Sequence, residues 1–178
     1  QAAVRGRLAV AGPAGAQRVD CEASVKFVSG EVIATVEGAK TLITWLAEPT
    51  AGVGEESDHF SRPGLLMDFS EDGLGGLVVS AVSASMTRVE DNQIGPAPGL
   101  ERLQMRVILE GDERLVWAAR NSQRGEAELA GRLKARWLRG LDVEVLADGD
   151  VVARSEFAFP EKAVLERLAG EALAKCRG

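Results

Sequence analysis

The chain has 178 residues, which suits one domain, and we predict a single domain over residues 1–178. Its formal net charge of −6 argues against nucleic acid as the main partner, because phosphate binding requires a basic surface. No unbroken apolar run of about 18 residues occurs, so the sequence predicts no transmembrane helix.

Alternating apolar and polar residues predict strands near the start of the chain. In segment 19–28 the apolar residues occupy every second position, which is typical of a strand with one buried and one solvent-facing side. These apolar residues are Val19, Cys21, Ala23, Val25 and Phe27. Segments 31–36 and 40–46 follow with a short polar spacing between them, which predicts a hairpin.

The alternation stops at residues 47–64, which are rich in Gly, Pro, Ser and acidic residues. We expect a long loop there, and loops of this length are usually functional or mobile. Beyond it, strands are predicted at residues 65–69, 77–89, 100–109 and 114–119. Residues 91–99 hold Pro96 and Pro98, and we expect these prolines to prevent regular strand pairing.

A first helix is predicted over residues 125–140. Leu129, Leu133 and Trp137 recur every four residues, which places them on one apolar stripe. Gly140 is expected to end this helix, because glycine readily adopts the left-handed conformation found after a helix.

The next stretch, "LDVEVLADGDVVARSEFAF", predicts a β-hairpin. A two-residue loop at 148–149 would mix apolar and polar residues on each face. A three-residue loop at 147–149 pairs Val145 with Val151 and keeps the apolar residues of both strands on one face. We therefore expect the longer loop, with Gly149 in the left-handed region.

A second helix is predicted over residues 160–176, with Pro160 at its first position and Cys176 on its apolar stripe. Because Cys21 and Cys176 lie on predicted buried faces at opposite ends of the chain, we predict a disulfide that ties down the terminal helix. The alternative is a pair of buried free thiols. A disulfide persists only in an oxidising compartment, which favours a periplasmic or secreted protein. The opening "QAAVRGRLAV" fits either a processed mature end or an arbitrary start.

The stretch "ELAGRLKARWLRGLDVEVLADGDVVARSEFAFPEKAVLERLAGEALAKC" resembles the end of the invasion-associated locus B family of proteobacterial envelope proteins. Members of that family tend to end in a helix, a hairpin with a Gly-containing turn, and a short helix preceded by an aromatic residue. The chain departs from them in lacking extra cysteines and a Gly-Phe pair before the last helix. The resemblance implies a periplasmic, β-sandwich-like domain of poorly defined function, and it assigns no catalytic residue.

His59, the single histidine, lies in the sequence "EESDHFS". A hydrolase would use it as a general base, but catalytic triads are assembled from distant segments, and adjacent residues cannot all point at one another. We therefore predict that His59 belongs to a solvated acidic loop. Asp68, Glu71 and Asp72 do not follow the spacing of a calcium loop, so we predict no metal site and no cofactor.

Arg132, Arg136 and Arg139 lie on one side of the first predicted helix. They are the candidate binding residues for an anionic polymer or an acidic partner. The alternative is a solvated helix face whose charge is balanced by Glu126 and Glu128.

Together these patterns predict an α+β fold, a mostly antiparallel β-sheet or sandwich with two helices near the C-terminus. They favour a secreted or periplasmic binding or structural module whose partner is a protein or an envelope component. An accessory of envelope assembly or secretion, and a hydrolase that uses the loop around His59, are the alternatives. A groove or an open sheet edge would favour the binding module, and a pocket joining His59 to a remote carboxylate would favour the enzyme.

Overall fold

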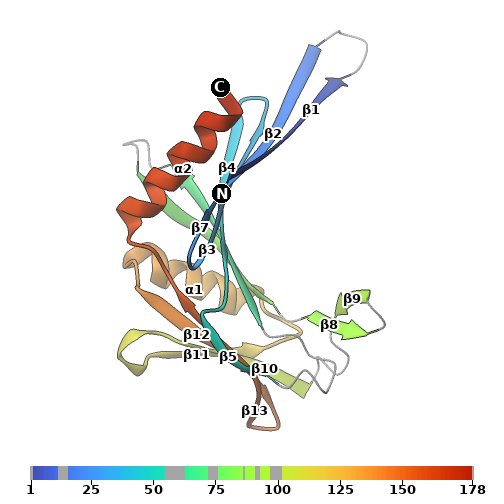
Figure 1. The fold of residues 1–178 in the computed structure, drawn as a ribbon. Coiled ribbons are helices and arrows are strands. Elements are labelled where there is room, and N and C mark those ends of the chain that lie inside the picture. Colours follow the sequence, from blue (N-terminus) through green and yellow to red (C-terminus); the bar gives the residue numbers. More distant parts are fainter. Residues whose placement is uncertain are drawn as a thin grey trace.

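The computed structural model describes residues 2–11, 16–54, 63–71, 76–85, 87–90, 93–96 and 102–177. Two antiparallel sheets and two helices make up most of this part of the chain, as Figure 1 shows. The predicted α+β class is therefore confirmed. Neither described helix is long and apolar enough to cross a membrane.

The larger sheet has six strands in the order β1-β2-β3-β4-β6-β7. Their bounds are β1 Ala2–Ala11, β2 Ala16–Phe27, β3 Gly30–Glu37, β4 Lys40–Ala47, β6 Gly64–Glu71 and β7 Leu77–Ser85. The register places Val25, Val32, Trp45, Met67 and Val82 opposite one another across five strands. All five side chains are buried, so one face of this sheet forms a continuous apolar layer.

The smaller sheet has five strands in the order β11-β10-β12-β13-β5. Their bounds are β11 Arg114–Ala118, β10 Leu103–Ile108, β12 Gly140–Ala147, β13 Asp150–Ala158 and β5 Ala51–Gly54. A short 3-10 helix, η3 (Glu110–Asp112), connects β10 to β11. Strand β5 lies within 47–64, so part of that segment, predicted to be a loop, pairs with β13 instead.

A separate two-stranded hairpin joins β8 (Thr87–Glu90) to β9 (Gln93–Pro96). The prediction that prolines prevent pairing in 91–99 is therefore wrong for residues 93–96, which pair with β8. Pro96 is the last residue of β9 and lies opposite Thr87 at the end of the ladder. Proline is tolerated at the end of a two-stranded ladder, because its missing N–H interrupts no row of bonds there.

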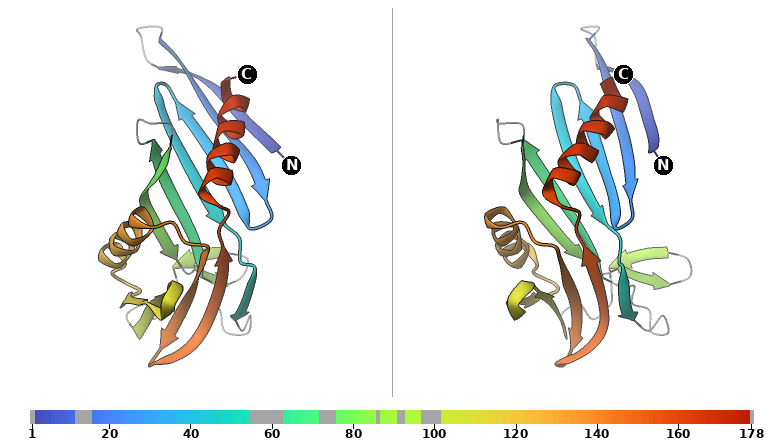
Figure 2. Two further views of the ribbon diagram at one scale, coloured as in Figure 1. Left: turned by 90° about the vertical axis from the view of Figure 1, so that its left-hand side faces the viewer. Right: turned by 60° about the vertical axis from the view of Figure 1, so that its left-hand side comes forward.

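Helix α2 (Lys162–Arg177) lies across the large sheet over β2 and β3, as both views of Figure 2 show. Its buried residues Leu165, Leu168, Ala169 and Ala172 face this sheet and join one apolar cluster that includes residues of both sheets and both helices. The predicted apolar stripe is confirmed, but α2 begins at Lys162, two residues after Pro160.

Helix α1 (Gln123–Ala135) ends before Trp137, not at Gly140 as predicted. Arg136 already has an extended backbone, with φ −151° and ψ 120°. The indole of Trp137 lies between two phenylalanine rings, 5.9 Å from the centroid of Phe69 and 5.2 Å from that of Phe159. Its N–H donates to the carbonyl of Pro160 at 2.9 Å. If the helix continued, the Trp137 ring would not reach these partners. The tertiary contacts therefore outweigh the helical spacing.

The β12–β13 hairpin turns through two residues, with φ of 50° at Asp148 and 85° at Gly149. The positive φ predicted for Gly149 is confirmed. Val145 pairs with Ala153, however, and not with Val151 as predicted. A β-bulge next to Val145 inserts one extra residue into β13 and restores the alternation that a two-residue loop would break.

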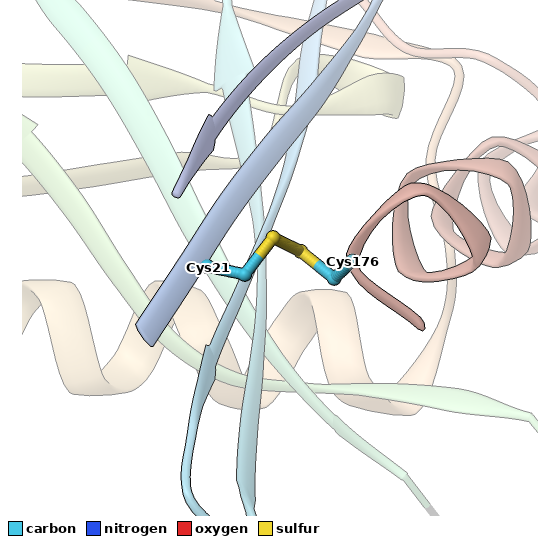
Figure 3. The surroundings of a disulfide bond; sticks show 2 residues. All are labelled: Cys21 and Cys176. Atoms are coloured by element: carbon cyan, nitrogen blue, oxygen red, sulfur yellow. A yellow bond between two sulfur atoms is a disulfide. The ribbon is translucent and has the colours of Figure 1, made fainter. Parts of the chain in front are cut away.

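Cys21 and Cys176 form a disulfide, as predicted (Figure 3). The bond joins β2 to the last turn of α2, and the two Cα atoms are 5.6 Å apart, within the usual range for disulfides. It links positions separated by 155 residues, and the Cys21 residue is only 7% exposed. The end of α2 is therefore covalently held against the large sheet.

Candidate functional site

Strand β7 is the last strand of the large sheet, so one side of its backbone faces no other described strand. Two glutamates from the helices bond to the ends of that side. The N–H of Leu77 donates to Glu166 Oε2 at 2.9 Å, and the N–H of Ala84 donates to Glu126 Oε2 at 2.7 Å. The two carboxylates thus cap the start and the end of the edge, where an exposed strand would otherwise invite pairing.

Between these caps the edge carries further backbone groups. In an antiparallel strand every second residue directs its N–H and C=O to the same side. Leu77 and Ala84 point away from β6, and a bulge near Ser80 shifts the register between them. By this alternation Val79 and Val82 also point away from β6, and in the described part of the chain no hydrogen-bond partner faces them. They are the open ladder positions of β7 in the sense that no described strand pairs with them; the residues themselves are only 5% and 6% exposed, because their side chains face the core.

A cavity of about 570 Å³ lies between this open edge and helix α1. Residues 78–82 of β7 form one wall, and the opposite wall is formed by Ala127, Ala130 and Gly131 of α1. Glu126 and Lys134 also line the cavity. A side chain added at Gly131 would meet no atom within 4 Å, so the groove is open in front of that residue. We call this site the β7–α1 groove.

The position of α1 follows from residues on its other faces. Leu129 and Leu133 are buried in the core. Gly125 packs against the indole of Trp117 on β11, and a Cβ atom at Gly125 would overlap that ring. Since both contacts hold α1 by other sides, its small residues are left facing β7, and the groove remains unfilled.

The candidate binding arginines do not form one helical row. Only Arg132 belongs to α1, because the helix ends at Ala135. The Arg132 guanidinium lies 3.0 Å from a carboxylate oxygen of Glu113. Arg136 pairs with Glu110 at 3.0 Å, and the main-chain N–H of Arg139 donates to the same carboxylate at 2.9 Å. Binding by these arginines stays a prediction, and a ligand there would compete with Glu110 and Glu113.

Of the predicted counter-charges, Glu128 lies 3.8 Å from Arg132, whereas Glu126 is engaged with β7. The balance of charge therefore comes largely from the β10–β11 connection. Sequence spacing within one helix gives no signal of that contact.

The structure places only part of the other clusters singled out in the sequence. His59 and Asp72 lie outside the described residues, so the non-catalytic role predicted for His59 stays a prediction. Asp68 accepts a hydrogen bond from Thr44 Oγ1 at 2.8 Å. Among the residues that the structure does describe, no group of three or more His, Cys, Asp or Glu is placed to hold a metal ion.

Ion pairs join a charge cluster on the small sheet, in which Arg154 Nε is buried without a hydrogen-bond partner. Arg154 lies 2.8 Å from Asp142 and 2.7 Å from Glu156, and its hydrogen bond with Asp142 raises the pKa of Arg154 above its ordinary value. Arg106 and Glu144 pair at 2.7 Å beside it. Apart from that nitrogen, the described charges of this cluster are paired within the fold.

The β7–α1 groove was not predicted from the sequence, although a strand was predicted at 77–89, where β7 lies. Gly131 was the one local signal, because glycine inside a helix lowers its stability without an evident reason. No protein-family model matches this chain, and no match is found among curated proteins or among solved structures.

Proposed function

We propose that this chain is a non-catalytic binding module that takes up an extended segment of a partner protein in the β7–α1 groove. One observation carries the proposal: the open ladder positions Val79 and Val82 border a cavity of about 570 Å³. A peptide that adds as a strand to a sheet edge gains main-chain hydrogen bonds, and pockets beside the edge accept its side chains.

The caps on β7 support a short and bounded site. Glu166 and Glu126 occupy the N–H groups of Leu77 and Ala84, so an added strand pairs only with the segment between them. Each main-chain bond contributes about 0.5–1.5 kcal/mol net, and apolar burial in the groove adds to it. These magnitudes favour a moderate, reversible interaction.

A compartment outside the reducing cytosol is part of the proposal. The Cys21–Cys176 disulfide supports it, because such bonds persist under oxidising conditions. The resemblance of the C-terminal third to locus B envelope proteins points the same way and favours the periplasm. An accessory role in envelope assembly or secretion would use the same groove for an envelope protein.

The test is a selection of displayed random peptides on three forms of the full chain. The first is the parent and the second is Gly131→Leu, which places a large side chain in the open space of the groove. The third is Gly170→Leu, a matched control, because Gly170 is an exposed helical glycine of α2 that also has nothing within 4 Å of an added Cβ. Leucine is the better helix former by about 0.8–1 kcal/mol, so both variants are expected to fold.

We expect the parent and Gly170→Leu to enrich the same peptides and Gly131→Leu to enrich none of them. Enrichment that is equal on all three forms would place binding elsewhere and overturn the proposal. Absence of enrichment on the parent would overturn it as well.

A further inference from the structure

The groove has a direction, because β7 and α1 run past each other in opposite senses. Glu126, near the start of α1, bonds to Ala84 at the end of β7. From there the strand wall runs back to Val78, whereas the helix wall runs forward to Lys134. Lys134 is two turns beyond Glu126, about 12 Å along the helix.

The two ends of the groove therefore differ in charge. The carboxylate of Glu126 is engaged by the N–H of Ala84 at one end. Lys134 is exposed at the other end, and in the part of the chain that the structure describes no carboxylate pairs with it. A ligand is thus attracted by a negative group at the Lys134 end and disfavoured by one at the Glu126 end.

The walls also set the shape of the ligand. The β7 wall spans residues 78–82, so about five residues of an added strand lie along it at 3.3 Å each. Alternate side chains of that strand point toward α1, where Ala127, Ala130 and Gly131 leave room for apolar groups. Antiparallel pairing is the more stable arrangement per residue, so the ligand would run opposite to β7.

We propose that the groove binds an extended peptide antiparallel to β7, with apolar side chains at alternate positions and a carboxylate side chain at its C-terminal end, against Lys134. An antiparallel strand starts beside Ala84 and ends beside Lys134, which gives this orientation. The inference rests on the proposed function and specifies the chemistry of the partner segment.

The test uses synthetic peptides and isothermal titration calorimetry on the full chain. The peptides TVSVSVD and DVSVSVT, both acetylated and amidated, share one composition and differ in which end carries the carboxylate. TVSVSVK replaces that carboxylate by an amine. The proteins are the parent, Lys134→Glu, and Gly131→Leu as the blocked form.

We expect the parent to bind TVSVSVD about two- to fivefold more tightly than DVSVSVT, the range of an exposed ion pair. Lys134→Glu should reverse the choice and prefer TVSVSVK to TVSVSVD, and Gly131→Leu should bind none of them. The backbone nitrogens of TVSVSVD form two alternating sets. Methylating one set should abolish binding and methylating the other should not, because only every second N–H faces β7.

Equal affinity for TVSVSVD and DVSVSVT, or a preference for DVSVSVT, would overturn the inference. Failure of all three peptides to bind the parent would also overturn it. A dimer of the chain, observed by sedimentation, that the peptides cannot dissociate would overturn it as well. The proposed function has a separate readout, because displayed peptides selected by the parent and lost on Gly131→Leu would leave it standing with a different ligand chemistry.

Discussion

The Cys21–Cys176 disulfide should supply a large share of the stability of this fold. Replacing both cysteines by alanine removes a cross-link between positions separated by 155 residues. The entropy of closing a loop of that length in the unfolded chain corresponds to about 5 kcal/mol at 25 °C. Natural domains are stable by about 5–15 kcal/mol, so the variant is expected to lose a third or more of its free energy of unfolding.

Urea unfolding followed by far-UV circular dichroism measures this loss. The slope of the free energy against urea should also increase, because the unfolded chain without the cross-link exposes more surface. The reduced parent is the control, since it lacks the bond and keeps both sulfur atoms. A double variant whose free energy of unfolding lies within about 1 kcal/mol of the oxidised parent would refute the loop-entropy reasoning.

Three further substitutions test other parts of the structure. Gly149→Val should lower the free energy of unfolding by about 1–3 kcal/mol, because φ is 85° there, and an unchanged urea midpoint would contradict this. Gly125→Ala should lower the free energy of unfolding by a similar 1–3 kcal/mol, since the new methyl group overlaps Trp117, although alanine is the better helix former. Urea unfolding followed by tryptophan fluorescence measures this, and an unchanged stability would contradict it. His59→Ala should leave any ester, glycan or peptide hydrolysis by the parent unchanged, and a loss of about 100-fold or more with the fold intact would favour an enzyme.

Local pattern was sufficient for the elements that carry their own periodicity. The alternation in 19–28 predicted a strand with Cys21 on its buried face, and the stripe in 160–176 placed Cys176 on the buried side of a helix. These two placements together predicted the disulfide that the structure contains. Each inference needed only the repeat of one element and the rule that apolar faces are buried.

Elements decided by distant contacts were predicted less well. Strand β5 forms because its backbone pairs with β13, about a hundred residues later in the chain, and its own sequence is aperiodic. Helix α1 ends early because the Trp137 ring packs between Phe69 and Phe159. The β12–β13 register depends on a bulge, and glycine spacing alone does not distinguish a bulge from a longer loop.

The groove forms only where β7 and α1 lie beside each other, so neither element alone predicts it. The β-rich run at 77–89 predicted the strand, and the leucine spacing predicted the helix. Their relative placement depends on Gly125 against Trp117 and on Leu129 in the core. Because these contacts join segments far apart in sequence, no window along the chain contains the site. Gly131, which local propensity disfavours, has no explanation in close packing, because a Cβ atom there would meet no atom within 4 Å.

The same two helices that complete the core also limit the open edge of the large sheet. Glu166 reaches β7 from α2, and Glu126 reaches it from α1, so the described edge lacks a bonded cap only between Leu77 and Ala84. A longer bare edge would pair with other copies of the chain, whereas a short edge beside a helix admits one strand at a time. The net charge of −6 adds repulsion between copies. On the proposed function, a bounded edge and a net negative charge would both favour binding of a partner segment over self-association.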